Sequence, residues 1–377
     1  MYVSKIRREL HMHPELGYDL PYTLGVVKRE LEKFSIPYTE KYGKSGIVAT
    51  INEGAPGKAL AIRADMDALP IQEANDVPYK SLYEGRMHAC GHDAHTAILL
   101  DTARKLTSLS VALTRPVKLI FQPAEEGGGG AGRMVQDGCM DDVDEIVAIH
   151  VNIQPACTVS FMTGPCNSAA SSVTIRFTGK SAHAAMQSSG SDAIMMAAHS
   201  LIAIESYLAK RFPSGSHILF NAGTIHGGTA ANIIADECTI KCTIRTRENQ
   251  DLEKFLDGIQ TIVKNTAEIF GGTGEAKING ITPVLVHDPI VTEHLRKAAE
   301  EVLGKENVFE MQRVAASEDF SVFAQKAPAT MMRLGCGNAE KGFVHPVHTP
   351  HFDIDESALD KGSDIYVRYL LNRMGIG

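Results

Sequence analysis

The chain lacks the features that mark several classes of protein. Its 377 residues contain no run near the ~18 apolar residues that a membrane span requires. The N-terminal segment MYVSKIRREL has no apolar core of a secretory signal. Basic residues are not in excess, and a formal net charge of −8 disfavours nucleic acid or an anionic membrane as the main partner. We therefore expect a protein that binds neither nucleic acid nor membrane.

Paired cysteines are also missing. The seven cysteines are odd in number and scattered, and no two of them form a CxxC pair. This pattern disfavours a disulfide framework and a structural zinc ribbon. It is typical of a reducing compartment, so the expected location is the cytoplasm.

The first part of the chain alternates helical and strand patterns. Apolar residues at helical spacing predict helices over 22–34 and 96–109. Short apolar runs predict strands at 46–51, 59–62, 117–121 and 145–149. Apolar strands separated by helices indicate an α/β fold with a mostly parallel sheet covered by helices on both faces.

The middle of the chain has a different pattern. Apolar and polar residues alternate over 173–178 and 238–245, which is typical of antiparallel strands with one wet face. Two long helical patterns accompany these strands. After them, the chain again alternates between helical and strand patterns, as in its first part. We predict a catalytic domain in two segments, 1–167 and 283–377. A small two-layer α+β domain, 168–282, is inserted between them.

Polar side chains follow each apolar strand of the first part. Asp65 and Asp67 follow the strand at 59–62, Glu125 and Glu126 follow the strand at 117–121, and His150 ends the next strand. Ligands of open α/β sheets bind beyond the carboxyl ends of the strands. These side chains are therefore expected at one edge of the sheet.

Two further segments carry metal-ligand residue types, MHACGHDAH at 87–95 and HPVHTPH at 345–351. Taken singly, most of the polar residues have a structural explanation. The aspartates suit turns or helix caps, the glutamates suit a solvated loop, and His150 suits a hydrogen-bonded core position. The cysteine–histidine segment is the exception, because His and Cys within three residues in a Gly-containing loop are typical metal ligands.

The residue types together fit hydrolysis at two divalent metal ions. Such ions polarise a carbonyl and activate water, and a carboxylate outside the ligand set acts as the general base. Adjacent glutamates meet both needs, since one can bind metal while the other faces the water. Asp65 is placed to orient a ligand histidine and fix its tautomer.

Nine motifs resemble one family in sequence and order. They are RADMDALPI, MHACGHDAHT, FQPAEEG, AIHV, GKSAHAA, GGTAANIIAD, TIRT, SEDFSVF and HTPHFDIDE. The chain resembles the aminoacylase, hippurate hydrolase and indole-acetyl-amino-acid hydrolase branch of the dinuclear metallopeptidases, from about His11 to the end. The resemblance implies Glu125 as general base and later acid, and Asp65 as the orienting carboxylate. The implied metal ligands are Cys90, His92, Glu126, His150 and His348.

The resemblance also gives roles to the inserted domain, which in the family is a lid and dimerisation domain. It implies that His183 reaches the partner subunit's site, and that Asn232 and Arg245 hold the substrate. Arg245 suits a carboxylate through its bidentate fork. The chain departs from the family at Met186, Gln187 and Ala235, where prolines are usual nearby, and this affects lid geometry and substrate preference.

Structural roles remain open for these residues: an interface position for His183, a helix cap for Asn232 and a surface ion pair for Arg245. The expected activity is removal of an acyl group from an N-acyl L-amino acid, in a homodimer formed through the lid. Acetyl, benzoyl, indole-acetyl and N-acetyl-diaminopimelate substrates all remain open. The alternatives are a dipeptidase or carboxypeptidase that uses the same site, and a metal-binding regulator without catalysis. The ligand types favour two Zn²⁺ or Mn²⁺ ions, with Co²⁺ and Ni²⁺ as alternatives.

Overall fold

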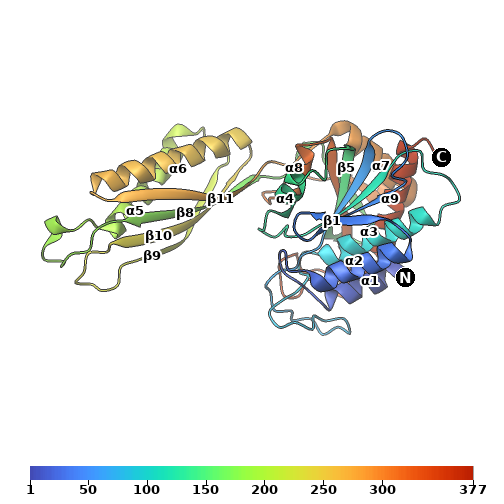
Figure 1. Ribbon diagram of the computed structural model, residues 1–377, viewed down its shortest axis with the longest axis horizontal. Helices are drawn as coiled ribbons and strands as arrows, with labels where there is room; N and C mark the ends of the chain where they lie inside the picture. The colour runs from blue at the N-terminus through green and yellow to red at the C-terminus, as the bar shows by residue number, and fades with distance from the viewer. Residues whose placement is uncertain (377) are drawn as a thin grey trace. The chain divides into compact units, whose positions relative to one another are not determined.

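The computed structural model describes residues 1–376 and divides into two compact units. The first comprises Met1–Cys166, Val286–Arg313 and residues 319–376, and the second comprises Asn167–Leu285 and Val314–Glu318. The second unit is thus inserted into the first. Segment 314–318 joins it as well, although the sequence placed that segment in the second catalytic segment. Figure 1 shows the chain from its N-terminus in blue to its C-terminus in red.

The first unit is built on an eight-stranded sheet with the order β1-β2-β4-β3-β5-β14-β6-β13. Strand β3 is parallel to both β4 and β5, and β5 is parallel to β14. Towards the edges, β2 is antiparallel to β1 and β4, and β6 is antiparallel to β14. The strands are β1 Tyr38–Tyr42, β2 Gly46–Ile51, β3 Ala59–Asp65, β4 Val117–Gln122, β5 Val143–Pro155, β6 Val159–Phe161, β13 Val308–Glu310 and β14 Ala329–Gly337.

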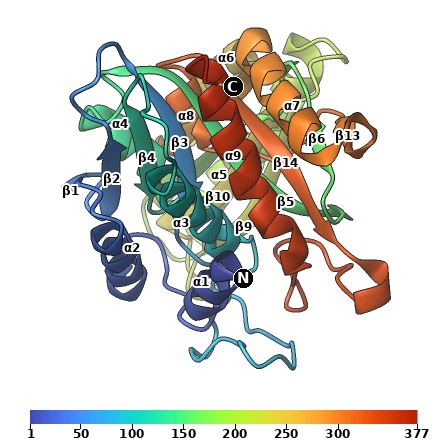
Figure 2. The same cartoon turned by 90° about the vertical axis from the view of Figure 1, so that its right-hand side faces the viewer.

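Helices cover both faces of this sheet, and for that reason every residue of β3 and β4 is buried. Figure 2 shows α3, α7 and α9 across one face. The short helices α4 and α8 lie on the other face (Figure 1). The predicted mostly parallel α/β fold is confirmed. The helices are α1 Tyr2–His11, α2 Pro21–Lys33, α3 His92–Thr107, α4 Gly130–Gln136, α7 Pro289–Leu303, α8 Phe320–Ala324 and α9 Leu359–Arg373.

The second unit is a two-layer α+β structure. Its four strands form an antiparallel sheet with the order β11-β8-β10-β9. Alternate residues of β8 and β10, such as Phe177 and Ile240, are buried against the two helices, as the alternating pattern predicted. The elements are β8 Ala169–Thr178, α5 Ala193–Arg211, β9 Leu219–Gly227, β10 Glu237–Thr246, α6 Asn249–Ile269 and β11 Thr273–Thr282.

The remaining elements of the chain are short. The two-residue strands β7 (Gly164–Pro165) and β12 (Val286–His287) pair where the chain leaves the first unit and returns to it. Four single-turn 3₁₀ segments are Gln187–Ser189, Lys305–Asn307, Ala339–Lys341 and Glu356–Ala358. Among residues 1–376, no helix combines the length and apolar composition needed to cross a membrane.

One sequence prediction about a strand was wrong, and one helix was missed. The strand predicted at 145–149 runs on to Pro155, so His150 lies inside β5 and not at its end. Strand β14 pairs with β5 along this extension and satisfies its backbone groups. Helix α1 was not predicted, although its apolar residues Val3, Ile6 and Leu10 are buried at helical spacing.

Candidate metal centre

The carboxyl ends of three neighbouring parallel strands bring the first site residues together. Asp65, the last residue of β3, lies opposite Gln122, the last residue of β4. On the other side of β3, Arg63 lies opposite Ala148 of β5, so His150 is level with Asp65 two residues further along. The strand register therefore places Asp65 and His150 side by side and starts the Glu125–Glu126 turn at the same edge.

A glycine between two predicted ligands allows close approach to β5. Gly91 has φ +90°, and a Cβ atom there would lie 2.3 Å from the Cγ2 atom of Val151. Only glycine avoids both the strained backbone and this overlap. Gly91 is the N-cap of α3, so Cys90 lies just before the cap and His92 is the first residue of the helix.

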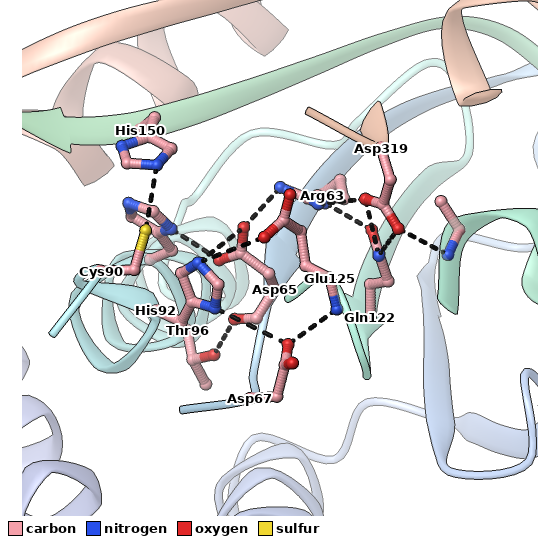
Figure 3. A network of polar contacts seen from close by, with 12 residues as sticks. Arg63, Asp65, Asp67, Cys90, His92, Thr96, Gln122, Glu125, His150 and Asp319 are labelled. Atoms are coloured by element: carbon pink, nitrogen blue, oxygen red, sulfur yellow. Dashed lines mark hydrogen bonds and ion pairs between the residues drawn. The ribbon is translucent and has the colours of Figure 1, made fainter. Parts of the chain in front are cut away.

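The two glutamates follow β4 in a tight turn that Asp67 holds. Ala124 has a positive φ of 53°, which turns the chain after the strand. The Glu125 backbone NH donates to Asp67 Oδ1 at 2.9 Å, and the Glu126 NH donates to Asp67 Oδ2 at 3.2 Å. One carboxylate thus fixes the backbone of both glutamates, and Figure 3 shows its bond to Glu125.

His348 comes from a loop late in the chain and has φ +63°, an unfavourable conformation for a residue with a side chain. Its backbone NH donates to the Ala89 carbonyl at 2.7 Å. This bond ties the loop to the segment that carries Cys90, so two regions remote in sequence meet at the site.

The structure brings all five predicted ligands together, in two groups that share Cys90. In the first group, Cys90 Sγ lies 3.5 Å from His150 Nε2, and His92 completes the set. In the second group, His348 Nε2 lies 3.3 Å from Cys90 Sγ and 3.3 Å from Glu126 Oε1. Each group offers three ligand atoms within 4.8 Å of one another.

Several ligand atoms of this cluster fit metal binding because no other bond uses them. Both ring nitrogens of His92 and the Oε1 atom of Glu126 are buried and make no hydrogen bond within residues 1–376. Buried polar atoms without partners are rare in folded proteins. The His150 Nδ1–H donates to the Val151 carbonyl at 2.7 Å, which leaves its Nε2 lone pair facing Cys90 (Figure 3).

The surroundings set the charges of these groups. Burial lowers the pKa of His150 well below its ordinary value, which favours the neutral ring that binds metal. Burial raises the pKa of the Cys90 thiol, so ionisation there requires a bound cation. Burial also opposes the charge of Glu126, but the nearby His348 and His92 rings hold the pKa of that carboxyl below its usual value.

Asp65 lies at the centre of a buried charge network. Burial opposes its ionisation, but the Arg63 guanidinium, 2.6 Å away, and the nearby histidines hold the pKa of Asp65 well below its usual range. Its closest histidine is His95, whose Nδ1 lies 2.6 Å from Asp65 Oδ1. The Oδ2 atom of Asp65 lies 3.6 Å from His92 Nε2. The orienting role expected for Asp65 towards a ligand histidine stays a prediction.

The structure separates the three histidines of the MHACGHDAH segment. His95 uses both ring nitrogens, one with Asp65 and one as acceptor for the Val151 NH at 2.9 Å. Within the described part of the chain, His88 joins no cluster of three ligand-type side chains. Of the three histidines, His92 is the one grouped with Cys90 and His150.

Sequence reasoning missed the roles of Asp67 and Arg63. Asp67 Oδ1 lies 3.7 Å from the Nδ1 atom of His92, in addition to its bonds with the glutamate turn. Arg63 is fully buried and also donates to Gln122 at 2.7 Å and to Asp319 at 3.1 Å. For Asp67, one indication was present in the sequence: it lies two residues after Asp65, so both carboxylates are at the end of the same buried strand.

The three predicted lid residues lie in the second unit. His183 and Asn232 come from adjacent segments, since the Ala184 NH donates to the Asn232 carbonyl at 3.0 Å, and both side chains are exposed. Arg245 lies on β10 and donates to the Ala315 carbonyl at 3.3 Å and to Ser317 Oγ at 3.1 Å. The roles of these three residues in catalysis or substrate binding stay predictions.

The whole chain is similar to known hydrolases. Residues 61–372 match the model of peptidase family M20/M25/M40. The chain is 35% identical to thermostable carboxypeptidase 2 of Saccharolobus solfataricus, over 96% of this chain and 93% of the relative. It is 33% identical to the N-acetyl-L-cysteine deacetylase of Bacillus subtilis, over 95% of this chain and 85% of the relative.

A solved structure has the same fold. It is that of a dinuclear metal-binding peptidase of the M20 family from Bacillus subtilis, with a TM-score of 0.81 and 27% identity. The match covers 100% of this chain and 98% of that one. The predictions of a dinuclear metallopeptidase relative and of a hydrolase acting on amide C–N bonds are confirmed. This chain belongs to peptidase family M20/M25/M40.

Proposed function

We propose that this protein hydrolyses the amide bond of N-acyl L-amino acids to a carboxylate and a free amino acid. One observation carries the proposal: two ligand groups converge on Cys90, and the carboxylate of Glu125 lies beside them. The Glu125 Oε2 atom is 3.9 Å from His92 Nε2. The similarity to a deacetylase of an N-acetyl amino acid supports this substrate class.

The five ligands Cys90, His92, Glu126, His150 and His348 would hold two divalent ions. When bound, such ions supply a Lewis acid for the carbonyl and for the attacking water. Cys and His ligands favour Zn²⁺ and the carboxylate also suits Mn²⁺, while Co²⁺ and Ni²⁺ fit the same donor set.

Glu125 moves the proton in this reaction. As the water oxygen bonds to the carbonyl carbon, Glu125 accepts one water proton. It then gives this proton to the amide nitrogen as the C–N bond breaks, so that the amine leaves neutral. Asp67 holds the backbone of Glu125 for this step, and Asp65 orients the ligand histidines.

The inserted unit supplies the remaining groups. In this proposal, His183 of one subunit stabilises the developing oxyanion in its partner's site. Asn232 and Arg245 hold the substrate, Arg245 through the carboxylate of the amino acid. Met186, Gln187 and Ala235 replace residues typical of the family and tune the acyl preference.

We propose a homodimer formed through the second unit. Strand β9 is at the edge of its sheet and nearly all its residues are exposed. Helix α5 exposes Ile194, Met195 and Ile202, and β9 exposes Leu219 and Ile225. An open edge beside exposed apolar side chains is a surface that a second copy covers by continuing the sheet.

We place the protein in the cytoplasm. All seven cysteines are free, and five of them, among them Cys166 and Cys336, are buried away from the metal ligands. Free buried thiols are stable in a reducing compartment.

A carboxypeptidase or dipeptidase is the second candidate, favoured by the similarity to the Saccharolobus carboxypeptidase. The test is hydrolysis by the purified protein of N-acetyl, N-benzoyl and indole-acetyl amino acids and of dipeptides, with and without chelator and with Zn²⁺ or Mn²⁺ restored. Higher kcat/KM on N-acyl amino acids, lost with chelator and restored by metal, supports the proposal. Higher kcat/KM on dipeptides favours the second candidate, and full activity in excess chelator refutes the metal mechanism.

A further inference from the structure

A second buried ionic cluster lies outside the ligand set. The Arg7 cluster comprises Arg7, His11, Glu73, Asp93 and Asp353, whose charged groups are almost completely buried. Arg7 Nε donates to Asp93 Oδ2 at 2.8 Å, and its Nη2 donates to Asp353 Oδ1 at 2.9 Å. His11 lies between two carboxylates, 2.7 Å from Asp93 and 3.3 Å from Glu73. Two basic side chains of α1 therefore join three separate segments of the chain.

Two of these segments carry predicted metal ligands. Asp93 directly follows His92 at the start of α3. Asp353 lies on the segment that follows His348, and the Tyr79 hydroxyl donates to its other oxygen at 2.8 Å. Arg7 thus makes ion pairs to the segments of both His92 and His348.

The His348 segment needs such support. The His348 side chain is half exposed and its backbone has a positive φ, a conformation that persists only where its surroundings impose it. The segment after Glu73 also holds the His348 segment: the Ala74 NH donates to the Pro350 carbonyl at 2.9 Å, and the Asn75 side chain donates to the Phe352 carbonyl at 3.0 Å. Glu73, next to Ala74, faces His11. The Arg7 cluster therefore reaches this segment by two routes.

Burial makes the cluster sensitive to the loss of a single member. A buried ion pair that loses one partner leaves an uncompensated charge, which drives local rearrangement. Without Arg7, the Asp353 carboxylate would lose its buried cation, and Asp93 would keep only His11 as a basic partner. Movement of the segment that holds Asp353 would relieve this charge, and it would carry His348 along.

We propose that Arg7 and His11 are positioning residues that hold His92 and His348 in register and so retain the metal ions. Arg7 acts on both ligand segments, whereas Asp353 transmits its effect to His348 alone. The proposal rests on the metal ligands assigned above. Helix α1 lies outside residues 61–372, the part of the chain that matches the family model.

The test is the rate at which zinc-loaded protein releases metal to a chelating dye, at a temperature where circular dichroism shows each variant folded. Loss of supporting contacts around metal ligands typically weakens affinity by about 10–100-fold. Arg7→Met should therefore release both ions at least about tenfold faster than wild type. Asp353→Asn, which keeps size and fold, should speed release of one ion only. Arg7→Lys should be intermediate, since an ammonium keeps the charge but not the planar fork.

Arg29→Met is the matched control, because Arg29 ties α2 to Glu9 of α1 at 2.7 Å and is half exposed. It should lower thermal stability without changing metal release. Release at the wild-type rate from both Arg7→Met and Asp353→Asn would overturn the proposal. Release that follows the melting temperature in every variant, Arg29→Met included, would also overturn it. A wild-type protein that binds no zinc would refute the metal site itself, which separates the two failures.

Discussion

The Asp67 carboxylate accepts hydrogen bonds from the backbone NH groups of both Glu125 and Glu126, at 2.9 and 3.2 Å. A side chain at the end of one strand thus fixes the turn after the neighbouring strand. The proposed base and the proposed ligand beside it therefore share one support, and a change at Asp67 should affect catalysis and metal binding together.

Asp67→Asn keeps the size of the side chain but one of the two acceptor oxygens becomes a donor, which repels a backbone NH. We expect kcat to fall by about 10–100-fold with weaker metal retention. Steady-state kinetics and elemental analysis check this result. Asp76→Asn is the control, since Asp76 is exposed and nearby in sequence. Unchanged kcat and metal content in Asp67→Asn would show that the turn holds its shape alone.

Glu125→Gln should lower turnover by at least about two orders of magnitude, because the amide cannot accept the proton from water. Its metal content should stay near that of wild type. Glu126→Gln should instead lose metal, since Glu126 is the proposed ligand. Metal stoichiometry and kcat measured for both variants decide the roles, and the opposite pattern would exchange them.

Cys90 should resist alkylation in the metal-loaded protein and react once the metal is removed, because a bound thiolate is shielded. Mass spectrometry after iodoacetamide treatment locates the modified cysteine. Cys139, which is also buried, is an internal control that should not respond to metal. Normal metal content and rate in Cys90→Ser would exclude Cys90 as a ligand.

His183 should act across the proposed dimer interface. Inactive Glu125→Gln subunits mixed with inactive His183→Ala subunits should then regain part of the activity, because mixed dimers contain one site with both groups intact. Native mass spectrometry verifies subunit exchange. No recovery after verified exchange would place His183 in its own subunit's site or in a structural role.

His11 should make folding stability depend on pH. Burial and the Arg7 charge lower its pKa, but Asp93 and Glu73 raise it above the ordinary 6.5. The neighbours Tyr79 and His88 also face this ring. A raised folded pKa gives stability that is fully present below pH 6.5 and is lost as pH rises through the folded value.

The stability difference between wild type and His11→Gln should therefore shrink as the pH rises above 6.5. Urea unfolding of the metal-stripped proteins between mildly acidic and alkaline pH measures the difference. Metal is removed so that its own pH-dependent binding does not contribute. A difference that stays constant or grows with pH would show that His11 is neutral in the folded protein.

Sequence patterns predicted most of the sheet that positions the site. Strand 46–51 was predicted with its observed bounds, because a short apolar run between turn residues has few alternatives. The extension of β5 past His150 could not be predicted, since it depends on pairing with β14 from a remote segment. Exposed strands such as β9 carry little periodic signal and were not predicted.

The sequence indicated which residue types form the site, but it did not indicate which of these side chains contact one another. Three histidines within eight residues look alike in the sequence, and only the bonds of His95 to Asp65 and to Val151 separate it from His92. The Arg7 cluster gave no sequence signal, because its charges become partners only after folding brings together residues such as Arg7 and Asp353, 346 positions apart.

The insertion of the second unit also fixes the order in which the metal site can be completed during synthesis. Cys90 and His348 are separated by 258 positions, and β14 joins β5 only after the inserted unit has been made. At about 5–20 residues per second, the ribosome needs on the order of 10–50 seconds to add the last proposed ligand after the first. For that interval the nascent chain exposes an unpaired strand and a thiol beside a partial ligand set. A site that uses both Cys90 and His348 therefore cannot be complete until the last part of the chain has been made.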